Sequence, residues 1–161
     1  MRAPGRPLHL VRRFFGSLRA RRPGPDAQLL VARALTPELA RLFWDQPVAD
    51  QAHGVAAARR IEAMAPQRPD LVCAALLHDV GKRHARLGVV GRSLASMAAM
   101  LRLPLARRHA RYLAHGDAGA IELEQAGATA IAVAFARHHH RARPDSVAPE
   151  DWDLLVQADD E

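Results

Sequence analysis

The chain has 161 residues, which is long enough for one domain with a single hydrophobic core. Hydrophobic residues make up 49% of it and aromatic residues only 4%, so with abundant Ala and Leu we expect an all-α protein. The formal net charge is +6, but one Tyr and two Trp are too few to build a base-stacking surface between the cations. We therefore expect anion binding rather than a nucleic-acid partner.

Residues 1–25 are interpreted as a basic amphipathic extension, and residues 26–161 as the domain. The extension carries seven arginines and no acidic residue, and Pro23-Gly24-Pro25 breaks the chain at its end. We expect residues 8–22 to dock on their own domain; disorder, or weak contact with an anionic membrane or a partner, are the alternatives. No apolar run approaches 18 residues, so a transmembrane helix is not expected.

Helix signals recur along the rest of the chain. Thr36 precedes Pro37, which is typical of an N-cap followed by proline at the first helical position. The apolar pattern and the breakers predict helices from Pro37 to about Trp44, from about Val48 to Met64, and from after Pro69 to the His78-Asp79 pair. Further helices are expected over 89–103, from Pro104 toward Tyr112, from a turn at 115–119 to Gly127, over 128–140 and over 151–158.

The most informative stretch is His78-Asp79-Val80-Gly81-Lys82. It follows the continuous apolar run 71–77, so a buried helix would deliver an imidazole and a carboxylate at its end. Such a ligand pair suits Mn, Fe, Co, Ni or Zn. Lys82 is the only lysine among 23 basic residues, which indicates a position that requires a compact ammonium.

Other histidines and acids are weak signals when taken singly. His53 lies in an Ala-rich helix, His115 precedes a glycine, and His138-His139-His140 could be a solvated helix end. Asp159 could be a solvated acid. Three histidines have arginines and no carboxylate near them in sequence, and we assign no role to them: His9, His84 and His109.

In order, however, the chain reads His, His-Asp-x-Gly-Lys, His-x-x-x-Gly, adjacent histidines and Ala-Asp. This series resembles the HD-domain superfamily of metal-dependent phosphohydrolases over roughly residues 45 to 160. The resemblance implies a helical bundle with a metal site between helices. It also implies that the first metal is held by His53, His78, Asp79 and Asp159.

The resemblance implies a second metal held by His115 and an adjacent histidine pair, which could be His138-His139 or His139-His140; we prefer the latter. Arg141 stands where relatives have an acid. By the same resemblance, Asp79 is catalytic as the bridge between the metals and Lys82 binds the substrate phosphate. Independently of the resemblance, Arg83, Arg86 or Arg92 are candidates to help Lys82 stabilise the negative charge of the transition state. The Gly-Tyr-Pro stretch of the cyclic-di-GMP phosphodiesterases in this superfamily is absent from the sequence, so that substrate is not expected.

We expect a metal-dependent phosphohydrolase that uses one or two divalent metals and metal-activated water on a small phosphomonoester or phosphodiester, nucleotide-like in chemistry. The alternatives are an HD-type di-iron oxygenase and a non-catalytic regulatory module. Cys73 is the only cysteine, which excludes an internal disulfide and fits a core residue in a cytoplasmic protein.

Overall fold

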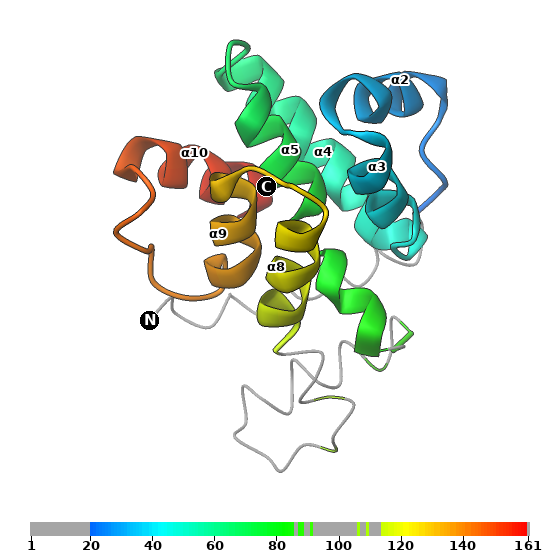
Figure 1. Cartoon of the computed structure of the whole chain (residues 1–161). Coiled ribbons are helices and arrows are strands. Elements are labelled where there is room, and N and C mark those ends of the chain that lie inside the picture. Colours follow the sequence, from blue (N-terminus) through cyan, green and yellow to red (C-terminus); the bar gives the residue numbers. More distant parts are fainter. Residues whose placement is uncertain are drawn as a thin grey trace.

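The computed structural model describes residues 20–85, 87, 88, 91, 106, 109 and 114–160. Across these residues the chain is helical and contains no strand, which confirms the all-α prediction (Figure 1). In the described residues the α-helices are α2 (Pro25–Ala34), α3 (Pro37–Trp44), α4 (Val48–Met64), α5 (Pro69–Leu77), α8 (His115–Gln125), α9 (Ala130–His138) and α10 (Pro149–Asp160). A 3₁₀ helix, η1 (Val80–Ala85), follows α5.

Local signals set several of these boundaries. The hydroxyl of Thr36 accepts a hydrogen bond from the backbone N–H of Leu39 at 3.4 Å, so α3 begins with the predicted cap. Thr129 caps α9 in the same way. Gly127 follows α8 with a φ of 74°, a left-handed conformation that ends the helix as the sequence predicts.

Helix α5 lies at the centre of the bundle. All seven residues from Leu71 to Leu77 are buried, and the helix contacts α2, α3, α4, α9 and α10 (Figure 1). Cys73 is one of these buried residues, as expected for a core position. Because the α5 backbone is surrounded by other helices, the residues at its C-terminal end occupy a fixed place inside the protein.

Helix boundaries differ from the sequence prediction at three places. Helix α8 begins at His115, so the predicted turn at 115–119 is wrong; its glycines lie inside the helix, where they face other backbones. Helix α9 ends at His138, and the two following histidines belong to a turn. Helix α10 begins at Pro149 and continues through Asp160, which places Asp159 inside a helix rather than in a tail.

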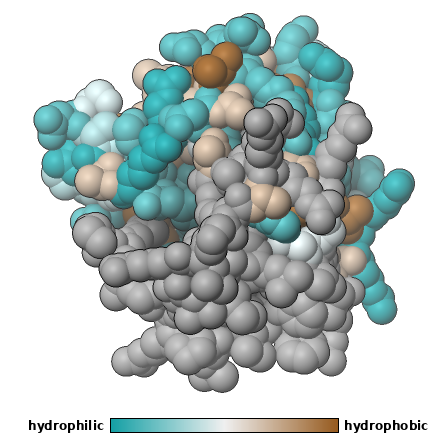
Figure 2. Space-filling model, turned by 90° about the horizontal axis from the view of Figure 1, so that it is seen from below, coloured by the Kyte–Doolittle hydropathy of each residue, from teal (hydrophilic) through white to brown (hydrophobic). Residues whose placement is uncertain are grey.

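Some predictions fall outside the described residues. These are the extension up to residue 19, the helices expected over 89–103 and 104–112, and Arg86 and Arg92. Within the described chain, helix α2 starts at Pro25, and no helix is both long and apolar enough to cross a membrane. On the face shown in Figure 2 the described surface is mostly hydrophilic with scattered hydrophobic spots.

Candidate metal centre

His78 and Asp79 lie at the C-terminal end of α5, where the buried apolar helix delivers both side chains into the interior. Their exposed fractions are 1% and 2%. Nδ1 of His78 lies 2.9 Å from the carbonyl oxygen of Ala75. A carbonyl oxygen only accepts, so Nδ1 carries a hydrogen, and in the neutral imidazole Nε2 presents its lone pair to the interior.

A first group of ligand-type side chains, the His78 group, surrounds this nitrogen: His53, His78, Asp79 and Asp159. Nε2 of His78 is 3.3 Å from Oδ2 of Asp79 and 3.2 Å from Oδ1 of Asp159. The same Asp159 oxygen lies 2.8 Å from Nε2 of His53. Helices α4 and α10 and the end of α5 therefore meet at this point, although His53 and Asp159 are 106 positions apart.

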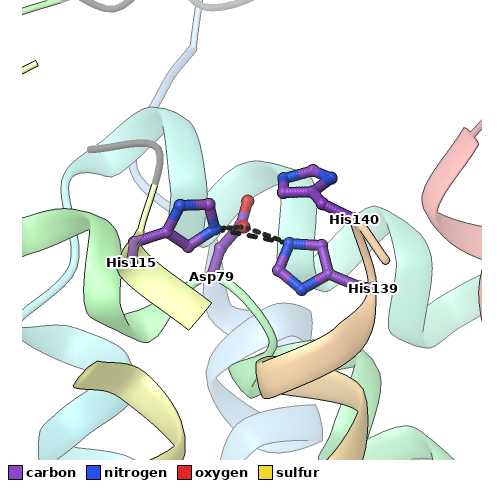
Figure 3. A group of neighbouring side chains, drawn as sticks. All are labelled: Asp79, His115, His139 and His140. Carbon is purple, nitrogen blue, oxygen red and sulfur yellow. Dashed lines mark hydrogen bonds and ion pairs between the residues drawn. The ribbon is translucent and has the colours of Figure 1, made fainter. Parts of the chain in front are cut away.

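A second group, the His115 group, consists of Asp79, His115, His139 and His140. Figure 3 shows His115 and His139 pointing at the Asp79 carboxylate from opposite sides, with His140 beside them; both ring Nε2 atoms lie 3.4 Å from Oδ1 of Asp79. One potential ligand atom from each of the four residues lies within 4.8 Å of the others. The structure thus brings His139 and His140 to the carboxylate, the pair preferred from the sequence.

The tautomer of His139 is also fixed by the backbone. Its Nδ1 lies 3.2 Å from the carbonyl oxygen of Phe135 and 3.0 Å from that of Ala136. Nδ1 therefore carries the hydrogen, and the Nε2 lone pair faces Asp79 and the ring of His115. Backbone carbonyls commonly orient metal-binding histidines in this way.

The donor set fits a divalent transition metal. Lone pairs of two oriented imidazoles and two carboxylates converge in a buried volume, and such an arrangement requires a proton or a cation between them. Nε2 of His78 and Oδ1 of Asp79 are buried, and among the described residues neither has a partner in hydrogen-bond geometry. Asp79 presents one oxygen to each group, so its carboxylate can bridge two ions.

The pKa shifts of the buried groups show that the centre favours positive charge. Burial lowers the pKa of His78, but the carboxylates of Asp79 and Asp159 outweigh it and raise the pKa to about 10. Burial also opposes ionisation of Asp79, yet His78 and Lys82 hold the pKa of this carboxyl well below its usual range. Both carboxylates therefore remain charged, as metal ligands must.

Two of the residues expected to bind substrate lie on η1. Lys82 is 3% exposed, and its ammonium pairs with Oδ2 of Asp79. Arg83 is engaged elsewhere: Nη2 lies 2.9 Å from Oε1 of Glu122. Substrate contact by Arg83 stays a prediction, and it would require the Arg83–Glu122 pair to open. Arg86 lies outside the described residues.

Glycines next to the ligand residues allow the elements that carry them to touch. A Cβ on Gly54 would lie 2.9 Å from the carbonyl oxygen of Leu76, and one on Gly116 would lie 2.8 Å from that of Ala136. A Cβ on Gly81 would lie only 2.1 Å from the carbonyl oxygen of His115. The chain therefore needs glycine at these positions to assemble the centre.

Several residues near the centre have partners that the sequence does not predict. His84 does have a carboxylate partner, because its Nε2 lies 2.9 Å from Oε1 of Glu122, 38 positions along the chain. Arg141, the departure from the expected acid, makes two hydrogen bonds to Asp117 at 3.1 and 2.7 Å. Pairs so distant in sequence leave no local signal.

Comparison with known proteins gives no match to a family model, to a curated protein or to a solved structure.

Proposed function

We propose that this protein is an HD-type metal-dependent phosphohydrolase that acts on a small phosphomonoester or phosphodiester. The observation that carries the proposal is the pair of buried His/Asp groups that share Asp79, with the only lysine of the chain against the shared carboxylate. Two adjacent ligand groups with one bridging carboxylate are typical of centres that hydrolyse phosphoesters.

His53, His78 and Asp159 would hold one ion, His115, His139 and His140 the other, and Asp79 would bridge them. Imidazole and carboxylate ligands suit Mn, Fe, Co, Ni or Zn and discriminate weakly among these ions. When bound, such ions supply Lewis acidity for the phosphoryl oxygens and allow water to act as a nucleophile at neutral pH.

The charges of the centre favour an anionic substrate. Two carboxylates cannot neutralise two divalent cations, and Lys82 adds another positive charge in a buried site where electrostatic interactions are strong. Lys82 would orient Asp79 through their ion pair and stabilise the negative charge that develops on the phosphoryl group. His140 is exposed and the His53 side chain is 25% exposed, so these two residues mark the accessible side of the centre.

The direct test is a hydrolysis panel on metal-reconstituted protein, with p-nitrophenyl phosphate, bis-p-nitrophenyl phosphate, nucleoside monophosphates and cyclic nucleotides as substrates. We expect turnover of at least one substrate, loss of turnover with a chelator, and a decrease of about 100-fold in kcat for Lys82→Met, which leaves every proposed ligand in place. Arg33→Gln, which changes a surface pair with Glu62, is the matched control and should leave turnover unchanged. Metal-loaded protein that hydrolyses none of these substrates would contradict the proposal.

The same preparation distinguishes the two alternatives. An HD-type di-iron oxygenase would retain iron and consume dioxygen when its substrate is added. A non-catalytic regulatory module would fold fully without metal and would show no turnover with any ion.

A further inference from the structure

We propose that Glu122 is a positioning residue, which holds η1 against α8 through Arg83 and His84 and thereby sets the metal affinity of the His115 group. The inference concerns the metal centre of the proposed phosphohydrolase and so rests on that proposal. Within the described part of the chain, Glu122 pairs with Arg83 and His84, which are not proposed ligands, so it acts through the helix that follows Asp79.

Glu122 lies on the same face of α8 as the ligand that this helix contributes. His115, Gly119 and Glu122 are spaced at i, i+4 and i+7, so they form one stripe along the helix. The stripe faces η1, because a Cβ on Gly81 would lie 2.1 Å from the carbonyl oxygen of His115 and 2.7 Å from the backbone nitrogen of Gly119. Backbone contact at one end of the stripe and an ion pair at the other therefore join the two helices.

The carboxylate of Glu122 contacts two consecutive residues of η1. Nη2 of Arg83 and Nε2 of His84 each lie 2.9 Å from the same oxygen, Oε1 of Glu122. The side chains of Arg83 and Glu122 are only 18% and 24% exposed, so solvent screens their interaction less than that of a surface pair. Lys82, directly before Arg83, pairs with Asp79, so η1 is anchored at its start to the bridging carboxylate, and Glu122 in turn anchors α8 to η1.

The second oxygen of Glu122 supports a role in positioning. Oε2 is buried and has no hydrogen-bond partner among the residues that the structure describes. A partly buried carboxylate with an unsatisfied oxygen is a costly way to fill space, and a neutral side chain would pack there at lower cost. Its presence is explained if the carboxylate is needed to hold the side chains of Arg83 and His84.

The expected effect is specific to one of the two groups. Helix α8 contributes His115 alone, and the His78 group contains no residue of α8. Loosening the contact between η1 and α8 should therefore weaken the binding of an ion by the His115 group and leave binding by the His78 group unchanged.

The test is a titration of metal-free protein with Co²⁺, followed by visible absorption and by elemental analysis after desalting. For Glu122→Gln we expect one of the two binding constants to fall about tenfold while the other is unchanged. Glu124→Gln is the matched control, because Glu124 lies on the same helix with a side chain that is 68% exposed and 3.9 Å from Arg137. Its two binding constants should equal those of the wild type.

A charge reversal separates positioning from a general loss of stability. The Arg83→Glu and Glu122→Arg variants should each bind the ion of the His115 group more weakly, and the double variant should recover the wild-type affinity. Arg83→Gln gives an independent measurement if Glu122→Gln fails to fold. The inference would be overturned if Glu122→Gln bound both ions as tightly as the wild type, or if it lost affinity equally in both groups. A wild type that bound fewer than two ions would also overturn it. A wild type that binds two ions without hydrolysing any phosphoester would refute the proposed function alone.

Discussion

Gly81→Ala is the substitution that most sharply perturbs the contact between η1 and α8. The new methyl carbon would lie 2.1 Å from the carbonyl oxygen of His115, and neither partner is a flexible side-chain end that can turn aside. To reach ordinary contact near 3.4 Å, the two backbones must separate by about 1.3 Å. Because Asp79 precedes η1 and His115 begins α8, this shift separates two proposed ligands of one ion.

We expect two measurable consequences. Overpacking of this kind costs about 1–3 kcal/mol, so the Tm should fall by about 2–10 °C in a chain of this size. A displacement of about 1 Å in a reaction centre costs about 100-fold in rate, and turnover should fall by at least that factor in kcat. Circular dichroism melts measure the first effect, and hydrolysis assays measure the second, with metal analysis on the same samples.

Gly127→Ala is the matched control. Gly127 has a φ of 74°, so alanine there is strained by about 1–2 kcal/mol, but no atom lies within 4 Å of the added carbon. This variant should lose similar stability and keep its metal. If Gly81→Ala binds metal as tightly as Gly127→Ala does, the close contact does not position the ligands and our reasoning is wrong.

Three further predictions concern stability. Phe135→Ala should destabilise the fold by about 3–5 kcal/mol in denaturant titrations, because the ring packs between two buried histidine rings and Trp152. Arg68→Gln should cost at most about 1 kcal/mol at neutral pH, because the side chain is 38% exposed. Its hydrogen bond lowers the pKa of Asp70, so this stabilisation is complete above about pH 5 and is lost as the pH falls through the lowered pKa. A metal at 100 times its Kd should add about 2.7 kcal/mol and raise the Tm by about 5–10 °C in thermal melts, and a chelator should reverse the shift.

Local sequence signals were sufficient to predict much of the fold. The cap at Thr36, the apolar run before His78 and the stop at Gly127 each depend on neighbouring residues, and the structure has helix boundaries at all three. The glycines at 116 and 119 misled the prediction, because glycine signals a turn when only neighbours are considered. In the structure they are required by backbones that approach from η1 and α9.

The candidate site was partly predictable for a different reason. The histidines and Asp159 stand out by residue type and order, but nothing in the sequence indicates which oxygen of Asp79 faces which ring. The partners of His84 and Arg83 were missed because Glu122 lies about 40 positions away and reaches them only after η1 and α8 pack together. Its spacing from His115 was the one available signal, since both residues share a helix face.

The most direct test of the central claim is metal content per chain. Untagged protein purified anaerobically would be analysed by elemental mass spectrometry beside Asp79→Ala, which removes the carboxylate common to both groups. We predict about two transition-metal ions per wild-type chain and a loss of both in the variant, because Asp79 would be a ligand of each ion. Wild-type protein that holds no metal, even after reconstitution with Mn, Fe, Co, Ni and Zn, would contradict the account.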